Sequence, residues 1–184
     1  MAAGLDADNH STIQLDGIPI IIRVESFKYL GSVLGDDVNI DADVKARMAC
    51  GWLKWRECSG VLCDKKMPLR LKGKIYRTVV RPALMYGSEC WAPTRKHEQT
   101  MHTTEMRMLR WTCSVTRLDK IPNTEIRQRL NVAPIIEKAQ EHRLRWFGHV
   151  KRRPDDYVGK VVQQMEIEGK RPRGRPKRRW MDVI

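Results

Sequence analysis

The sequence lacks any long apolar run. No stretch of its 184 residues approaches the roughly 20 consecutive apolar residues of a membrane-spanning helix. The short apolar run at 18–24 contains Arg23 and follows acidic residues, which is unlike a secretory signal peptide. These absences predict an intracellular protein of the cytoplasm or nucleus, with no membrane partner.

The usual catalytic patterns are also missing. The sequence has no glycine-rich phosphate loop, no HExxH helix and no Ser, His and Asp arrangement of a hydrolase. The Gly35-Asp36-Asp37 turn could hold Mg²⁺ through adjacent carboxylates. Two-metal chemistry needs a further carboxylate on a neighbouring strand, however, and Gly and Asp are what an ordinary turn requires. We therefore predict no catalytic residue, no metal site and no cofactor in this chain.

Cysteine is sparse and odd in number. Five cysteines cannot all pair within one chain, and without a secretory signal they are expected to be reduced thiols. The pairs Cys58-x4-Cys63 and His97-x4-His102 approach the local spacing of zinc ligands. Because the stretch between the pairs is much longer than in a compact zinc finger, structural roles are favoured.

Acidic residues are absent from a stretch near the C-terminus. Residues 170–179 contain seven cations, two prolines and one glycine. Proline disfavours helix both at its own position and at the residue before it, so this composition predicts an extended, solvated, disordered basic tail. Such a tail can lie along nucleic-acid phosphates or a narrow minor groove. It can equally serve as a nuclear-localisation signal or an unstructured solubilising tail.

Cations are scarce at the N-terminus. Residues 1–40 carry two cations against six acids, so the net charge of +13 is concentrated downstream. This bias predicts an anionic partner, RNA or DNA, held with little sequence preference. If roughly six to ten phosphates are neutralised, affinity should fall by roughly 10³ to 10⁵ between low and moderate salt. The helical cations expected to contact phosphates are Lys72, Lys74, Arg77, Arg81, Arg107, Arg110, Arg143, Arg145, Lys151, Arg152 and Arg153.

The apolar pattern predicts a mainly α fold. Two short runs rich in β-branched or aromatic residues, 18–24 and 27–34, predict an N-terminal β-hairpin. From Asp41 the period becomes helical, with Asp41 or Asp43 as the cap and an end near Asp64. Further helices of a bundle are predicted from Pro68 to an interruption at Pro82, from Arg95 to Cys113, from a capping Asn123 to Leu130, and from Pro134 to Val150.

Tryptophan recurs beside cations, as in Lys54-Trp55-Arg56, Arg110-Trp111 and Arg145-Trp146. Such pairs could stack bases while the cations hold phosphates. Helical periodicity alone also places indoles in the core and their charged neighbours outside. We favour the core role for each indole, and either Trp111 or Thr112 should face inward.

Several motifs carry a resemblance to a known family. Phe27-Lys-Tyr-Leu-Gly-Ser32 resembles the segment that follows the catalytic palm strands in reverse transcriptases of LINE-type, non-long-terminal-repeat retrotransposons. Residues 75–91, 107–111 and 143–150 are similar to the family's thumb, a following helix and its carboxy-terminal region. The tail at 171–177, with Trp180, is similar as well, so the resemblance covers about residues 14–184.

The resemblance implies a fragment of an RNA-directed DNA polymerase. Its parts would be a flexible N-terminus at 1–13, a palm-edge, primer-grip-like hairpin at 14–40, a helical thumb and connector at 41–168 and a basic tail at 169–184. The family's catalytic aspartates lie upstream of such a hairpin, so the chain would not be an enzyme on its own, and Mg²⁺ is expected only for the missing palm. Primer–template nucleic acid would contact the hairpin through Phe27, Lys28 and Tyr29, and the tail through Lys170, Arg171, Arg173, Arg175, Lys177, Arg178 and Arg179.

Two alternatives stay open. The chain could be a standalone DNA-binding protein whose Arg173-Gly174-Arg175-Pro176 segment acts like an AT-hook in the minor groove. It could also be a nonfunctional gene relic, unstable because its hairpin has lost the sheet it once joined. The sequence leaves the oligomeric state and the preference for RNA or DNA undecided.

Overall fold

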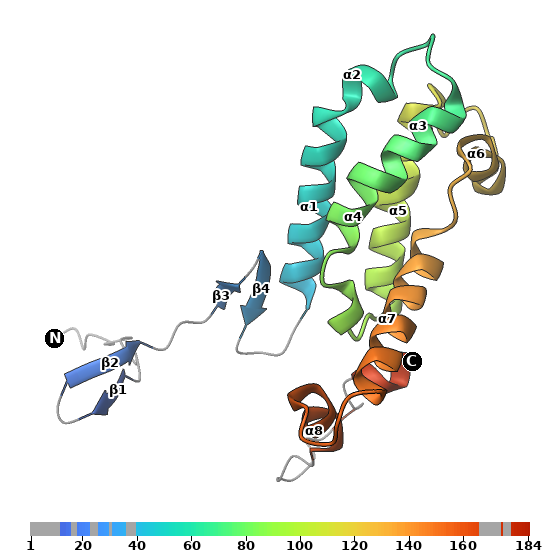
Figure 1. The fold of residues 1–184 in the computed structure, drawn as a ribbon. Coiled ribbons are helices and arrows are strands. Elements are labelled where there is room, and N and C mark those ends of the chain that lie inside the picture. Colours follow the sequence, from blue (N-terminus) through green and yellow to red (C-terminus); the bar gives the residue numbers. More distant parts are fainter. Residues whose placement is uncertain are drawn as a thin grey trace, which may run out of the picture.

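The computed structural model describes residues 12–15, 18–22, 26–29, 31–35, 40–165, 174 and 178–184 (Figure 1). Its first described elements are two antiparallel hairpins. Strand β1 (Thr12–Leu15) pairs with β2 (Ile18–Ile22), and β3 (Ser26–Tyr29) pairs with β4 (Ser32–Gly35). An N-terminal hairpin is therefore confirmed, but the strands pair differently from the prediction. The second apolar run folds back on itself at Gly31, whose φ of 81° suits a residue without a Cβ.

The first predicted helix is present in two pieces. α1 (Asp41–Glu57) is followed after Cys58 by the single turn α2 (Ser59–Leu62), so the predicted end near Asp64 holds. The predicted caps are wrong. Ile40 is the N-cap, and Asp41 and Asp43 instead lie in the first turn, where a negative charge still favours the helix.

Helix continues through Pro82, contrary to the prediction. α3 (Leu69–Ile75) leads into a π-helical segment, η1 (Tyr76–Val80), and then into α4 (Arg81–Met85). Proline normally breaks a helix because it lacks an N–H and its ring meets the carbonyl four residues earlier. The π segment adds a residue to the turn just before Pro82, and so relieves that clash without ending the helix.

The remaining helices follow their local start signals. After η2 (Ser88–Cys90), α5 (Arg95–Thr112) begins with a capping box between Thr94 and His97. α6 (Asn123–Leu130) and α7 (Ile135–Lys151) each begin directly after a proline. Asn123 does not cap α6 as predicted, because it is the first residue of the helix and Pro122 is the N-cap; its side-chain oxygen accepts a hydrogen bond from Arg110. α8 (Val158–Gln164) and the 3₁₀ turn η3 (Trp180–Val183) complete the described chain.

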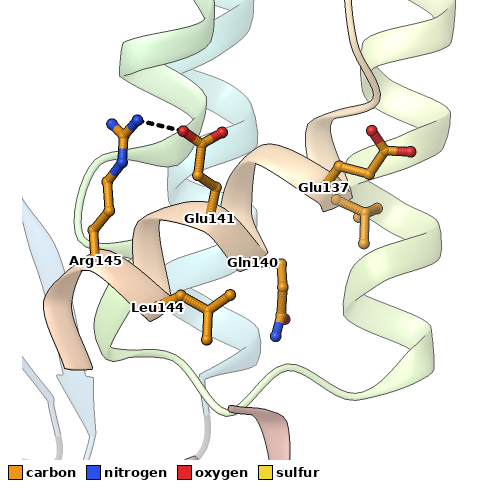
Figure 2. A pocket seen from close by; sticks show the side chains of 6 residues that line it. Glu137, Gln140, Glu141, Leu144 and Arg145 are labelled. Atoms are coloured by element: carbon orange, nitrogen blue, oxygen red, sulfur yellow. Dashed lines mark hydrogen bonds and ion pairs between the residues drawn. The ribbon is translucent and has the colours of Figure 1, made fainter. Parts of the chain in front are cut away.

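The outer face of α7 carries a shallow, open depression. Figure 2 shows it between successive turns of the helix, with Arg145 reaching back to the carboxylate of Glu141. Leu144 lies half-exposed beside this pair. The lining consists of Ile136, Glu137, Gln140, Glu141, Leu144 and Arg145, a set with no nucleophile and base in the arrangement that catalysis requires.

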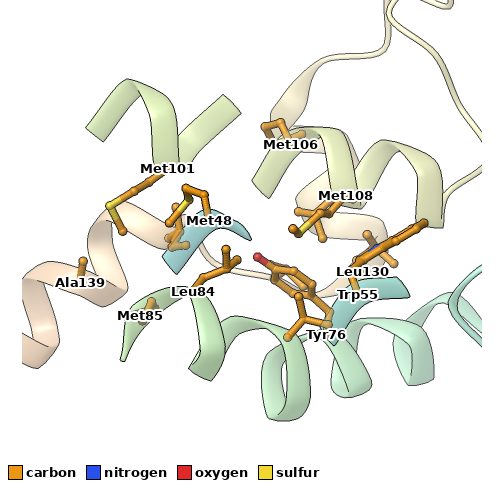
Figure 3. Packing of buried hydrophobic residues seen from close by; sticks show 14 of the residues in the cluster. Met48, Trp55, Tyr76, Leu84, Met85, Met101, Met106, Met108, Leu130 and Ala139 are labelled. Carbon is orange, nitrogen blue, oxygen red and sulfur yellow. The ribbon is translucent and has the colours of Figure 1, made fainter. Parts of the chain in front are cut away.

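The core lies between α1, the α3–α4 path, α5 and the start of α7 (Figure 3). Tyr76, Leu84, Met108 and Leu130 are completely buried in it. Methionines from α1, α4 and α5 fill much of the space. Their flexible side chains adapt to the irregular gaps between helices. Burial of each large apolar side chain stabilises the fold by about 1.5–3 kcal/mol.

α1 and α5 run parallel to each other. At their N-terminal ends His97 Nε2 contacts the carboxylate of Asp41. At their C-terminal ends Trp55 Nε1 donates to Thr112 Oγ1 across 3.4 Å. The two helices therefore present one continuous outer face along their shared length.

The C-terminal segment returns to the bundle. Trp180 Nε1 donates to the backbone oxygen of Glu89 at 2.7 Å, and Arg178 donates to that of Pro93 at 2.8 Å. Val183 is buried, and Gln140 donates to the backbone of Ile184. The predicted disordered tail therefore does not extend over 178–184, because these hydrogen bonds and the burial of Val183 fix that part onto η2 and α7.

Candidate nucleic-acid interface

Some cations predicted to contact phosphates lie inside the protein instead. Lys72, Arg81 and Arg143 are all buried. Lys72 Nζ donates to the backbone oxygen of Thr112, and Arg81 donates to Glu105 and to the backbone of Ala133. We correct the prediction for these three, since a buried cation that serves the fold cannot meet a phosphate chain.

Glu105 explains why Arg81 is buried. Its carboxylate is 0% exposed and accepts hydrogen bonds from Tyr76, Arg81, Arg127 and the backbone N–H of Ile135 at 2.9–3.1 Å. A buried charge is tolerated when it is paired and fully hydrogen-bonded. Burial, and next the charge of Glu105, raise the pKa of the Tyr76 hydroxyl well above its usual value. The cluster ties η1, α4, α5, α6 and α7 together.

Arg143 is also buried, but it has fewer hydrogen-bond partners than Arg81 and no ion pair among the described residues. It is 2% exposed and donates to Gln140 Oε1, while its Nε and Nη1 have no hydrogen-bond partner in the part of the chain that the structure describes. Burial lowers its pKa, Glu98 opposes that shift and Arg178 reinforces it. Arg143 therefore belongs to the packing of α7 against α5 and the C-terminal segment.

Three further predicted cations lie at the surface but are engaged with the protein. Arg77 donates to the backbone oxygen of Asn131. Arg110 donates to the backbone oxygens of Thr116 and Ile121 and so holds the loop after α5. Arg145 pairs with Glu141 on α7. Their charge still contributes to the surface potential, although their hydrogen-bonding groups are partly used.

The end of α7 gathers exposed cations from the predicted set. Lys151, Arg152 and Arg153 are all exposed there. Lys151 Nζ lies 5.5 Å from the ring centre of Phe147, and the guanidinium of Arg153 lies 5.6 Å from that of Tyr157. Lys74 is exposed on α3, away from this group.

A line of cations and one indole runs along the outer face of α1. Lys45, Ala49, Trp52 and Arg56 follow one another at intervals of four, three and four residues, which places them on one side of the helix. Lys45, Ala49 and Arg56 are exposed and Trp52 is half-buried.

α5 carries a second line beside the first. Lys96, Thr100, Thr103, Arg107 and Trp111 share one face, again at intervals of three or four residues. The guanidinium of Arg107 lies 5.6 Å from the ring centre of Trp52, and the Trp52 and Trp111 rings lie 6.2 Å apart, so the lines meet. We call these nine residues the α1–α5 stripe.

The stripe carries four cations, one of which is paired with a carboxylate. Lys96 lies 3.7 Å from Asp41 at the N-terminal end. Within the described part of the chain, no ion pair involves Lys45, Arg56 or Arg107. Cations that are not neutralised nearby, set beside indoles, form the kind of surface that binds a nucleic-acid strand.

Sequence reasoning found only part of the stripe. It named Arg107, and it considered Arg56 only as a neighbour of Trp55. It missed Lys45 and Lys96, which the spacing of three and four residues on α1 and α5 could have indicated. Trp55 and Trp91 are buried as expected. Thr112 is the residue that faces inward, and Trp111 is 58% exposed, so the core role favoured for every indole is wrong for Trp111.

The β3–β4 hairpin presents aromatic rings to the surface. Phe27 and Tyr29 are exposed and stacked, with ring centres 6.4 Å apart, and Lys28 between them is exposed too. The hairpin is held on α1, because Asp43 Oδ1 accepts from the backbone N–H of Val33 at 3.2 Å. The hairpin residues expected to grip a primer are thus accessible.

Several predicted residues lie outside the described residues. These include the Gly-Asp-Asp carboxylates Asp36 and Asp37 and the tail cations Lys170, Arg171, Arg173, Arg175 and Lys177. Of the remaining tail cations, Arg178 is committed to Pro93, whereas Arg179 is exposed.

The described residues offer neither a metal cluster nor a membrane helix. Among them, no group of three or more His, Cys, Asp or Glu side chains could hold a metal ion. His97 contacts Asp41, and His102 contacts Asn123 and Arg127. No helix in the described part of the chain is both long and apolar enough to cross a membrane.

Comparison with known proteins gives one similarity over nearly the whole chain. A transposon-derived protein of Caenorhabditis elegans, itself described as uncharacterized, is 27% identical over 182 residues, or 95% of this chain. The chain spans 62% of that relative's length. No protein-family model matches the chain, and no solved structure matches it significantly.

Proposed function

We propose that this chain derives from a transposable element and forms the nucleic-acid-holding, thumb-like region of a LINE-type reverse transcriptase. The similarity to a transposon-derived protein supports the origin. The ordered motifs at 27–32, 75–91 and 143–150 support the reverse-transcriptase assignment. In this proposal the chain holds primer and template and does not polymerise without a separate palm.

The α1–α5 stripe is the observation that carries the proposal. It sets four cations beside two indoles on the shared outer face of two parallel helices. The helices fix the backbone positions of these cations before a phosphate chain arrives, so binding orders only their side chains. They read no base edges, so binding should depend on salt and hardly on sequence.

Fluorescence anisotropy with a labelled primer–template tests the proposal. Four phosphate contacts predict that affinity falls roughly 50- to 150-fold between about 50 and 200 mM salt. The exposed cations at the end of α7 would steepen this dependence further. Absence of binding at low salt, or binding that ignores salt, would contradict the proposal.

A matched pair of double variants locates the interface. Lys45→Gln with Arg56→Gln should lower the salt slope by about 1.4–1.8, because two phosphate contacts are lost. Arg129→Gln with Lys138→Gln removes the same charge from cations already paired to Glu125 and Glu141, and should change the slope far less. Equal losses from the two double variants would show that net charge, and not the stripe, determines binding.

A further inference from the structure

Trp111 packs against two other indoles although most of it is exposed. Its ring makes edge contacts with Trp52 and Trp55, at centre-to-centre distances of 6.2 and 5.6 Å and interplanar angles of 66° and 73°. Trp55 is itself buried and hydrogen-bonded to Thr112. The indole of Trp111 is thus fixed from one side by the core, while 58% of it stays open to solvent.

A fixed, open aromatic ring can bind a flat partner at low entropic cost. Indoles have few rotatable bonds, and the two edge contacts restrict those of Trp111 before any ligand arrives. A single exposed apolar side chain is ordinary by itself. Here the ring lies one helical turn from Arg107, which has no ion pair among the described residues, and such a neighbour can hold a phosphate while the base stacks on the ring.

We infer that Trp111 is the stacking platform for an unpaired nucleobase, so that the α1–α5 stripe binds single-stranded nucleic acid in preference to duplex. The inference rests on the proposed function and names its substrate class. Bases in a duplex have both faces covered by their neighbours, whereas a single strand can turn one face onto the indole. Arg107 lies over the Trp52 ring, and Arg56 is exposed one helical turn after Trp52, so these two cations would hold the phosphates that flank the stacked base.

The test compares labelled single-stranded and duplex oligonucleotides by anisotropy with the full chain. Trp111→Ala should weaken single-strand binding about 5- to 150-fold, the range expected for one stacked base, and change duplex binding little. Trp111→Phe keeps an aromatic face and should fall between wild type and alanine. Leu118→Ala removes an apolar side chain that is highly exposed outside the stripe, and should have no effect.

Salt titrations separate stacking from charge. Trp111→Ala should leave the salt slope unchanged, whereas Arg107→Gln should lower it by about 0.7 for one single-strand phosphate. If Trp111→Ala binds single strands as tightly as wild type while binding stays salt-dependent, the stacking inference fails and the proposed function stands. Equal losses on single strands and duplex would also overturn the inference. So would unchanged oligonucleotide binding with loss of self-association in sedimentation velocity, because the indole would then be a protein contact.

Discussion

Replacement of Glu105 by glutamine gives the most direct measure of how charge is arranged inside this bundle. The carboxylate accepts hydrogen bonds from Tyr76, Arg81, Arg127 and the backbone of Ile135, and is completely buried. Glutamine has the same shape but no charge, and its amide nitrogen can only donate. One of the two arginines would then face a donor in place of an acceptor.

The expected loss of stability follows from the guanidinium groups of Arg81 and Arg127, which stay buried without the charge of Glu105. Breaking a buried ion pair by removing one partner costs about 3–5 kcal/mol, because the other charge stays buried without compensation. In a domain of this size 1 kcal/mol lowers the melting temperature by about 2–4 °C. Glu105→Gln should therefore lower the melting temperature by roughly 6–20 °C.

Circular dichroism melts of purified variants measure this effect. Glu137→Gln is the matched control, because Glu137 is exposed on α7, and it should stay within about 0.5 kcal/mol of wild type. A Glu105→Gln protein that melts within about 1 °C of wild type would refute the reasoning, since no buried pair of this kind could then exist.

Three other perturbations have outcomes set by packing or burial. Gly73→Ala should lower the free energy of unfolding, measured in urea, by about 1–3 kcal/mol, because the added Cβ would lie 1.8 Å from the backbone oxygen of Leu130. Its control is Gly60→Ala, whose Cβ meets nothing within 4 Å, so that this change should be neutral or slightly stabilising. Asp43→Ala should accelerate amide hydrogen exchange in β3 and β4, because the hairpin keeps the hydrogen bond from Arg47 to Ser32 but loses the one from Val33 to Asp43. Burial raises the pKa of Tyr76, so its stabilising contribution is complete below the unfolded pKa of about 10 and is lost above it at up to about 1.4 kcal/mol per pH unit. Tyr76→Phe should remove this fall of the unfolding free energy with pH, which denaturant titrations at several pH values measure.

Local signals in the sequence were enough to place most helices. α5 and α6 begin at the predicted Arg95 and Asn123, and α7 begins directly after the predicted Pro134. Start signals such as capping and proline act over one turn and need no distant partner. The helix through Pro82 was missed for a related reason. Its π segment depends on packing that keeps Tyr76 and Val80 in the core, and propensity rules assume α geometry throughout.

The sorting of cations into inner and outer ones could not be read from the sequence. Arg77 and Arg81 lie four residues apart on one helical path, yet Arg77 is only half-buried and Arg81 is buried. What separates them is Glu105, which is 24 residues further along the chain. A buried arginine needs a carboxylate at a particular place in space, and only the packing of α5 against η1 and α4 provides it.

The α1–α5 stripe also depends on the packing of helices that are far apart in the sequence. Each of its two lines is a local pattern that the spacing on α1 or α5 could reveal, but a binding surface requires the lines to lie side by side. Contacts at opposite ends of the helices fix that arrangement, Asp41 with His97 at one end and Trp55 with Thr112 at the other. Because Trp55 also supports the ring of Trp111, the proposed stacking site is built directly on the core. Changes that loosen the core near Trp55 should therefore weaken single-strand binding even when every cation of the stripe is retained.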